Sequence, residues 1–284
     1  MRRSLWSART KSVTASVALV SVAAAAVVLA SKADGLPPTH ADLNDGGVWV
    51  TNSSDANGLV ARFFVPIDQQ DAPGSGLGAG FDVVQLGSDV VLVGTQGDLQ
   101  PWDTVNNAPV GNPRHFGAAS SVSIGGEESS DFAQSRSVTA ILDQSSGALR
   151  VVSTRNLATF DPAKSKPIVS LGEKASVVVA PDGSVVGLSA KDRAVIVFAP
   201  GSTSEPTTTP LPSQLSGSEL ALTTVGTGAV VLDPSTQNLL LPDGHVEPVS
   251  GFGNRLVLQQ PGPDSRTVLL GSPQGVVEVP LDHG

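Results

Sequence analysis

Residues 176–198, SVVVAPDGSVVGLSAKDRAVIVF, show in one stretch the pattern that decides the fold. Three short runs rich in β-branched residues, 176–180, 184–188 and 194–198, are separated by turn-forming residues. The Pro-Asp-Gly at 181–183 is a strong turn signal between strands. Because the apolar residues do not recur at the i, i+3, i+4 spacing of a helix, the stretch predicts three short consecutive strands.

Runs of the same kind recur from residue 46 to the end of the sequence. They lie at 47–51, 82–86, 89–93, 137–142, 148–153, 220–224, 229–232, 255–258, 267–270 and 275–279. A Gly-led strand phrase begins at Gly47, Gly97, Gly147, Gly183, Gly228 and Gly275. Repeats of about 45 residues with about four strands each are typical of β-propeller blades. The sequence therefore predicts an all-β domain of six propeller-like repeats over residues 46–284, with a pair of β-sandwiches as the alternative.

Two further patterns mark the turns of this domain. A strand ends in Asp and runs into turn-forming residues at Asp143, Asp161 and Asp233, and Pro-Asp-Gly returns at 242–244. Residues 201–213, GSTSEPTTTPLPS, predict a long loop between blades because strand-like runs continue on both sides of them. A linker between two domains is the alternative for this segment.

The composition limits both the partners and the chemistry. At 40% hydrophobic and 15% charged residues, a chain of 284 residues can bury a core and is not disordered as a whole. The absence of Cys excludes disulfides, thiolate metal sites and thiol nucleophiles. The formal net charge is −9, and the residues after 31 carry 13 basic and 26 acidic side chains. Such a surface repels phosphates, so we expect no nucleic acid as a partner.

The N-terminus predicts a membrane segment. Residues 1–11 are basic, and residues 12–31 are uncharged and mostly Val and Ala. A helix of 20 residues spans the roughly 30 Å hydrocarbon layer, and the basic flank stays in the cytoplasm. We therefore expect a single-pass helix over 12–31, a polar tether over 32–45 and an extracytoplasmic domain over 46–284. A signal peptide cleaved after Ala33 is the alternative, and it places the domain on the same side of the membrane.

We find no catalytic or cofactor motif in the sequence. The Gly-rich stretch 74–80 departs from G-x-G-x-x-G, and neither a P-loop nor a nucleophile elbow occurs. The four His lack the spacing of metal ligands. The acidic group Glu127, Glu128 and Asp131 predicts a solvated loop, with a weak cation site as the alternative. We therefore predict no catalytic residue, no metal ligand and no cofactor.

Two residues are candidates for a binding surface. Trp102 follows Pro101 near a turn, where an exposed indole would offer the kind of contact used at carbohydrate and protein interfaces. His115 is one of two His within the domain, and we expect it in a surface loop. Trp49, in contrast, stands in an alternating strand and is expected in the core.

The N-terminal sequence resembles a known family. The basic N-terminus, the Val/Ala helix, ADLNDGGVWVTN at 41–52 and GLVARFFVPID at 58–68 are similar to the start of large actinobacterial membrane-anchored surface proteins. Those proteins carry tandem fibronectin type III or Ig-like domains after a membrane segment and a propeller-like region. The resemblance covers about residues 1–100 and implies a role in adhesion or envelope scaffolding. The present sequence contains no such repeats, and no catalytic residue is carried over from the family.

Three functions follow from these observations as hypotheses of different classes. The first is a non-catalytic envelope protein, a scaffold or interaction module facing outside, bound to the cytoplasmic membrane by its N-terminal helix and to envelope proteins. The second is a module that binds cell-wall glycan. The third is an enzyme acting on extracellular polysaccharide.

Overall fold

The computed structural model describes residues 47–52, 59–64, 69–74, 80–117, 120–126, 136–202, 205–252, 255–263 and 265–281. Within these ranges the regular elements are strands, apart from the 3-10 helix η2 (Thr154–Thr159) and isolated turns. The prediction of an all-β domain is therefore confirmed. The predicted membrane helix at 12–31 and the tether at 32–45 lie outside the described residues. No helix in the described ranges is long and apolar enough to cross a membrane.

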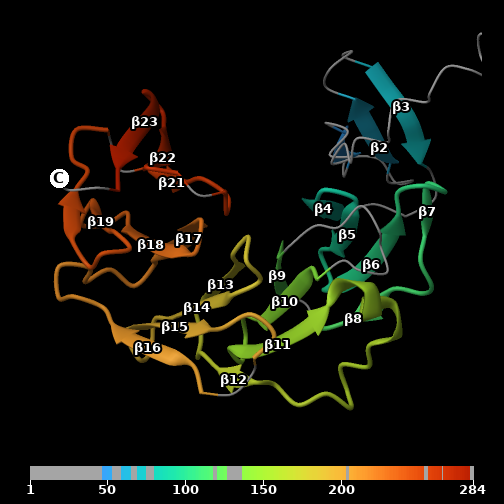
Figure 1. The fold of residues 1–284 in the computed structure, drawn as a ribbon, viewed down its shortest axis with the longest axis horizontal. Coiled ribbons are helices and arrows are strands. Elements are labelled where there is room, and N and C mark those ends of the chain that lie inside the picture. The colour runs from blue at the N-terminus through green and yellow to red at the C-terminus, as the bar shows by residue number, and fades with distance from the viewer. Residues whose placement is uncertain are drawn as a thin grey trace, which may run out of the picture. The chain divides into compact units, whose positions relative to one another are not determined.

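The described strands form six antiparallel sheets that follow one another in chain order (Figure 1). The first sheet contains β1 (Gly47–Asn52), β2 (Leu59–Phe64) and β3 (Gln69–Gly74). The second contains β4 (Phe81–Leu86), β5 (Asp89–Gly94), β6 (Asp98–Asp103), β7 (Ala108–Pro109) and β8 (Arg114–His115). The third contains β9 (Ser120–Gly125), β10 (Val138–Asp143), β11 (Ala148–Ser153) and β12 (Val169–Ser170).

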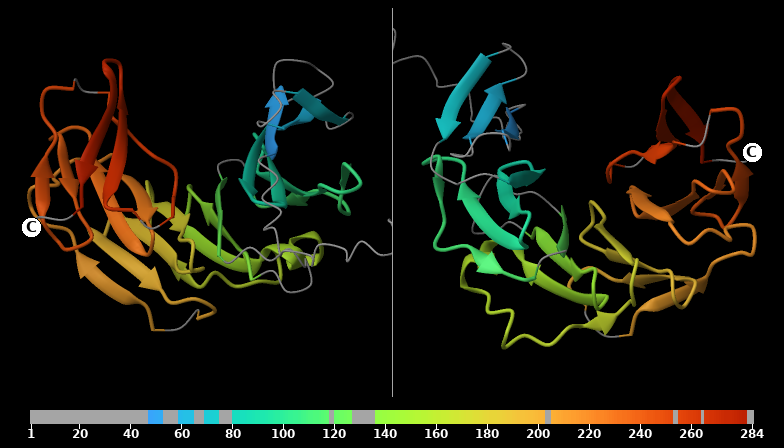
Figure 2. Two further views of the ribbon diagram at one scale, coloured as in Figure 1. Left: turned by 45° about the horizontal axis from the view of Figure 1, so that its top comes forward. Right: turned by 180° about the vertical axis from the view of Figure 1, so that it is seen from behind.

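The remaining three sheets continue this pattern (Figure 2). The fourth contains β13 (Ser176–Val179), β14 (Val185–Ser189), β15 (Ala194–Phe198) and β16 (Thr207–Pro210). The fifth contains β17 (Ala221–Val225), β18 (Gly228–Asp233), β19 (Asn238–Leu240) and β20 (Val246–Pro248). The sixth contains β21 (Val257–Leu258), β22 (Thr267–Ser272) and β23 (Gly275–Pro280).

The first strand of each sheet contacts the first strand of the next. These contacts join β1 to β4, β4 to β9, β9 to β13, β13 to β17 and β17 to β21. Within a sheet, the later strands pair outward one by one, as in the register of β13, β14 and β15. Small sheets that meet through their first strands and stack face to face are the arrangement of propeller blades.

Five clusters of buried side chains hold the consecutive sheets together. Each cluster takes its members from two neighbouring sheets: first and second, second and third, third and fourth, fourth and fifth, and fifth and sixth. Strand β13 shows why both faces are apolar, since Val177 and Val179 join one cluster and Val178 joins the next. Successive side chains of a strand point to opposite faces, and each buried Val or Leu contributes about 1.5–3 kcal/mol.

The structure confirms the three strands predicted from residues 176–198 and corrects two other expectations. The Gly-led phrase does not mark one repeated position, because Gly47 begins the first strand of a sheet, Gly228 a second strand and Gly275 a third. The phrase describes a tight turn followed by a strand, and in the described residues such turns precede second strands and third strands alike. Residues 201–213 are not simply a loop, since they contain the exposed edge strand β16.

Candidate functional site

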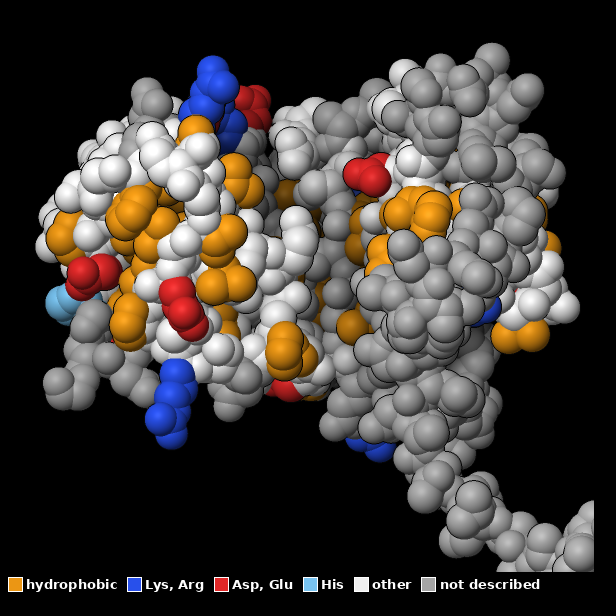
Figure 3. Space-filling view, turned by 90° about the horizontal axis from the view of Figure 1, so that it is seen from above, with side chains coloured by type: hydrophobic (Ala, Val, Ile, Leu, Met, Phe, Trp, Pro, Cys, Tyr) orange, Lys and Arg blue, Asp and Glu red, His pale blue; other side chains and the backbone are white. Residues whose placement is uncertain are grey.

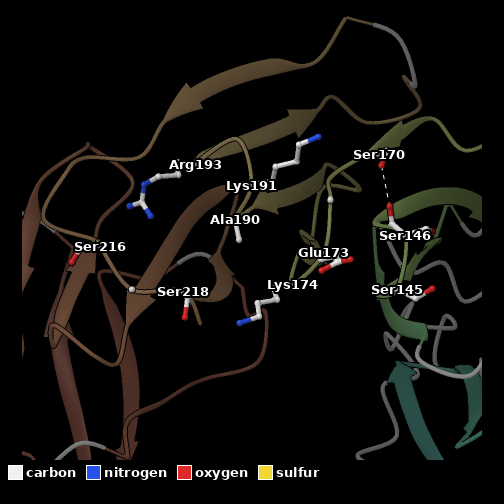
Figure 4. Close-up of a pocket in the computed structure, with 12 residues that line it drawn as sticks. Ser145, Ser146, Ser170, Glu173, Lys174, Ala190, Lys191, Arg193, Ser216 and Ser218 are labelled. Carbon is white, nitrogen blue, oxygen red and sulfur yellow. Dashed lines mark hydrogen bonds between the residues drawn. The ribbon is translucent and has the colours of Figure 1, made fainter.

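A polar cavity of about 670 Å³ opens at the turn ends of the third, fourth and fifth sheets (Figure 4). Its walls come from the β10–β11 turn, the segment between β12 and β13, the β14–β15 turn and the segment between β16 and β17. The lining residues are Ser145, Ser146, Ser170, Gly172, Glu173, Lys174, Ala190, Lys191, Arg193, Ser216, Gly217 and Ser218. Small polar residues and cations thus dominate a surface formed by three separate sheets.

The β10–β11 turn supplies one wall and is fixed by the Asp143 carboxylate. Asp143 Oδ1 accepts hydrogen bonds from Ser145 N at 2.9 Å and Ser145 Oγ at 2.6 Å, and Oδ2 accepts one from Ser146 Oγ at 2.8 Å. The bond from the Ser145 hydroxyl is the main reason why the pKa of Asp143 is lowered, although burial acts in the opposite direction. Both Ser hydroxyls therefore donate to this carboxylate, and Ser146 Oγ also accepts a hydrogen bond from Ala148 N at 3.3 Å.

The β14–β15 turn repeats this construction with Ser in place of Asp. Ser189 Oγ accepts a hydrogen bond from Asp192 N at 3.0 Å and lies 2.8 Å from Leu171 O. The turn ends at Arg193, whose φ of 48° is in the left-handed region. The Arg193 guanidinium donates to Leu215 O and so joins the turn to the segment between β16 and β17.

The opposite wall depends on Asp233 at the end of β18. This carboxylate is completely buried and accepts hydrogen bonds from Gly217 N at 2.6 Å, Ser235 N at 2.9 Å and Ser235 Oγ at 2.6 Å. Burial raises the pKa of Asp233, but hydrogen bonds from Ser235, Gly217 and Thr236 outweigh it, so the pKa is lowered overall. A Cβ at position 217 would lie 2.3 Å from Asp233 Oδ1, which explains the glycine there.

The lining carries three cations and a single acid. Lys174 and Lys191 are exposed, and Arg193 is half-buried, whereas Glu173 is the one carboxylate among the twelve lining residues. In Figure 4, Glu173 and Lys174 extend from the segment between β12 and β13, and Lys191 and Arg193 extend from the β14–β15 turn. The excess of positive charge is local, because the whole chain has a net charge of −9. Cations of this kind attract anionic groups, by about 0.2–1 kcal/mol for each solvent-exposed pair.

The hydroxyls of Ser145 and Ser146 are held as hydrogen-bond donors and are not paired with a strong base. A nucleophilic Ser requires a base within hydrogen-bond reach, in most cases a His oriented by a third group. Ser145 and Ser146 instead donate to Asp143, whose lowered pKa makes it a weak base. The lining residues include no His. The arrangement can hold hydroxyl, carboxylate or phosphate groups through hydroxyls and cations.

The structure corrects the prediction that Trp102 belongs to a binding surface. Trp102 is only 5% exposed and lies in the cluster between the first and second sheets, where its ring meets Trp49 edge-on at 6.4 Å. Its indole N–H is satisfied by Asn107 Oδ1 at 3.2 Å. Burial of the large apolar ring outweighs the preference of its neighbours in the chain for a turn. Trp102 is therefore a core residue, as Trp49 was expected to be.

His115 is exposed, as expected, but it does not line the cavity. It lies on β8, and its Nδ1 is 3.0 Å from Asp98 Oδ1. The structure therefore does not bring Trp102 and His115 into one site. The acidic group at 127, 128 and 131 lies outside the described residues, and the described residues contain no cluster of three His, Cys, Asp or Glu that could hold a metal ion.

Sequence reasoning missed the cavity because its residues come from four segments in three sheets. Asp143 and Asp233 had been identified as turn positions, and both prove to support its walls. The cations Lys174, Lys191 and Arg193 carry no motif. Only the fold, which places the ends of neighbouring sheets together, reveals that they share a surface.

Neither a protein-family model nor a curated protein matches this chain. Solved structures do: virginiamycin B lyase from Staphylococcus aureus is 13% identical, with a TM-score of 0.53 over 84% of this chain and 78% of that chain. A computationally designed protein is 14% identical, with a TM-score of 0.51 over 84% and 72%. The dihydro-heme d1 dehydrogenase NirN is also 14% identical, with a TM-score of 0.51 over 84% and 54%. At these identities the likeness shows the fold alone, and the fold it shows is propeller-like.

Proposed function

We propose that this protein is a membrane-anchored, extracytoplasmic interaction module that binds another component of the cell envelope without catalysing a reaction. The observation that carries the proposal is the cavity, because three sheets contribute hydroxyls and cations to it, while the nearby carboxylates of Asp143 and Asp233 fix the turns that form its walls. The virginiamycin B lyase and NirN structures are named as enzymes, but their likeness supports only the shared fold.

The location outside the cytoplasm rests on the sequence. The uncharged residues 12–31 with their basic flank support a signal anchor, and a cleaved signal peptide would place the domain on the same side. A reporter fused after residue 45 is expected to be active only outside the cytoplasm. Activity of that reporter inside the cytoplasm would contradict the proposal.

A cell-wall glycan is the second candidate for the ligand. The Ser hydroxyls of the lining suit the hydroxyl groups of a sugar, and Lys174 and Lys191 suit an acidic substituent. The burial of Trp102 removes the aromatic platform that first favoured this hypothesis. Binding would therefore depend on hydrogen bonds and charge rather than on ring stacking. An envelope protein with an acidic surface loop is the partner expected under the first hypothesis.

The experiment measures retention of the full chain, solubilised in detergent, on isolated cell-wall material and on a membrane-protein fraction. The double variant Lys174→Ala/Lys191→Ala removes two cavity cations, and Lys164→Ala/Lys166→Ala removes two exposed cations elsewhere. At about 1 kcal/mol per lost contact, we expect the first to weaken binding by roughly tenfold or more and the second to have little effect. Equal weakening by both, or by neither, would refute the cavity as the binding surface. Retention by one fraction and not the other distinguishes the two ligands.

A further inference from the structure

Strand β16 differs from the other described strands in its exposure. All four of its residues are exposed, as are the two residues before it, so that 205–210, EPTTTP, form one uninterrupted exposed run. Successive side chains of a strand point to opposite faces, and a strand with one packed face therefore alternates between buried and exposed. Among the strands whose side chains are all described, β16 is the only one that is exposed along its whole length. Both of its faces are open to solvent.

The strand is held through its backbone and not through its hydroxyls. Its register pairs Thr207, Thr208 and Thr209 with residues 195–197 of β15, and it is the last strand in the order of its sheet (Figure 1). Elsewhere Thr hydroxyls serve the fold, as in the buried contact of 3.0 Å between Thr139 Oγ1 and Thr154 Oγ1. The hydroxyls at 207–209 form no hydrogen bond with any described residue, so all three are free to carry a substituent.

Other exposed strand positions have a different chemistry. On β21, β22 and β23 they include Val257, Leu269 and Val276, and Figure 3 shows hydrophobic side chains gathered on the described surface. Such side chains gain free energy from contact with another surface. A hydroxyl loses free energy on burial unless it finds a partner. The three adjacent Thr side chains of β16 are therefore suited to stay in water, where an enzyme can reach them.

Two Pro residues fix this run in an extended form. Pro206 and Pro210 lock their own φ, and Pro210 also disfavours a helical conformation at Thr209 before it. Extended Pro-containing segments keep their shape without tertiary contacts, so the hydroxyls are presented in the same way before the domain folds. Pro has no N–H to donate, and at an edge it opposes the addition of a further strand.

We propose that Thr207, Thr208 and Thr209 are sites of O-glycosylation. The segment around them, 201–213, contains three Ser, four Thr and three Pro among thirteen residues, a composition typical of O-glycosylated segments. The inference rests on the extracytoplasmic location in the proposed function and is independent of the cavity. Phosphorylation, another modification of hydroxyls, requires ATP and therefore belongs to the cytoplasmic side.

The transfer is a simple substitution at the sugar. Nucleotide sugars stay in the cytoplasm, so the donor outside is a sugar linked to polyprenyl phosphate. Thr Oγ1 attacks C1 of the sugar, the Oγ1–C1 bond forms, and the bond between C1 and the phosphate oxygen breaks. The hydroxyl proton passes to a base of the transferase, and polyprenyl phosphate leaves. Thr207 and Thr209 project from one face of β16 and Thr208 from the other, so the folded domain has room for sugars on both faces.

The test uses the full chain, purified in detergent from the membranes of a bacterium that O-glycosylates its own exported proteins. Trypsin and a Glu-specific protease release residues 194–219, because neither Lys nor Arg occurs between Arg193 and Arg255 and a Glu-Pro bond resists cleavage. Electron-transfer fragmentation keeps the sugar on its side chain and so assigns it to a residue. We expect hexose on at least one of the three Thr and none on Thr159, whose exposed side chain donates to Asn156 O at 3.1 Å.

The control is the triple variant Thr207→Val/Thr208→Val/Thr209→Val, which keeps β-branched side chains in an exposed strand and should lose the whole mass increment. The same increment in this variant would place the sugar elsewhere and overturn the inference. Unmodified Thr in an exported chain would overturn it too, but would leave the proposed binding function intact. Phosphate on these Thr would contradict both the inference and the proposed location. Hexose on them, together with full binding by the cavity variant, would support the inference and refute the cavity.

Discussion

Replacing the buried carboxylate Asp233 by an amide tests how the cavity wall is held. In Asp233→Asn the volume is conserved, but only one side-chain oxygen remains. In the native protein one oxygen accepts from Gly217 N and the other from Ser235 N and Oγ. Whichever way the amide is turned, its NH₂ group faces a backbone N–H that has lost its acceptor. A hydrogen bond to a charged group is worth about 1.5–3 kcal/mol, and the orphaned donor adds a penalty of similar size.

We therefore expect Asp233→Asn to lower the free energy of unfolding by about 3 kcal/mol or more at neutral pH. For a domain of this size that corresponds to a fall in Tm of roughly 6–12 °C. The matched control is Asp182→Asn, because Asp182 accepts the same two bonds from Ser184 N and Oγ, both at 2.8 Å, in an exposed turn. Water replaces a lost partner there, so the control should lose less than about 1 kcal/mol.

The difference in the free energy of unfolding between the native protein and Asp233→Asn also depends on pH, and the sign of this dependence can be predicted. The pKa of Asp233 is lowered in the folded protein, so the folded state binds fewer protons than the unfolded state in the acid range. The carboxylate's contribution is present in full above its ordinary pKa of 3.8 and is lost as the pH falls through the lower folded value. Urea titrations from pH 7 down to pH 2 should show the two proteins converging below about pH 4. A constant difference over that range, or equal losses at positions 233 and 182, would refute the reasoning.

Three further predictions follow from single positions. Trp102→Ala should lower the free energy of unfolding by about 3–5 kcal/mol, because it empties part of a buried cluster. At a temperature where the variant is folded, its retention on envelope material should be unchanged. Lost binding together with native stability would show instead that Trp102 belongs to a binding surface. Lys174→Gly should raise the free energy of unfolding by about 1 kcal/mol, because Lys174 has a φ of 57°. The same substitution should weaken binding to envelope material. A stabilised variant with full binding would show that the Lys174 cation is not part of the binding site. Gly147→Ala should lower Tm more than Gly244→Ala does. Both glycines have a positive φ, but only a Cβ at position 147 meets backbone, 2.2 Å from Gly172 N. Equal decreases in Tm would mean that φ strain alone determines the effect.

The strands were predictable because their signal is local. In residues 176–198 the β-branched runs and the Pro-Asp-Gly turn indicate both the strands and their order, and the register pairs β13 with β14 and β14 with β15. The buried run at 177–179 needed no alternation, since the sheets on both sides of β13 are apolar. By contrast, β16 consists of Thr and Pro, and only its pairing with β15 makes it a strand.

The repeated Gly phrase does not mark the same position in each sheet, although the predicted number of repeats agrees with the number of sheets described. A glycine with positive φ is required by a tight turn, and such turns follow first, second and third strands alike. Gly97 and Gly147 precede third strands, whereas Gly183 precedes a second strand. The repeating unit of a propeller is a whole sheet, so no single sequence phrase marks where each repeat begins.

The misplacement of Trp102 has a different physical origin. Its neighbours Pro101 and Asp103 are turn-forming residues, so local chemistry predicted an exposed loop. In the structure β6 continues through both of them, and Trp102 pairs with Val90 on one side and Pro109 on the other. Burial of the indole against Trp49 outweighs the local preference, and that contact joins residues more than 50 positions apart, beyond what a local pattern can predict.

The turns beside the cavity separate the residues that hold the fold from those that can bind. Asp143, Ser189 and Asp233 occupy the first position of their turns, where a side-chain oxygen accepts backbone N–H groups. The fifth position of each has a positive φ, but the residue there is Gly147 in one turn, Arg193 in the next and Gln237 in the third. An L-residue in that region costs about 1–2 kcal/mol, which Gly would avoid. Since the backbone is held from the first position, the fifth can change its side chain without changing the turn. Arg193 makes use of that freedom at the cavity, where its cation and its bond to Leu215 O join two sheets at the proposed binding surface.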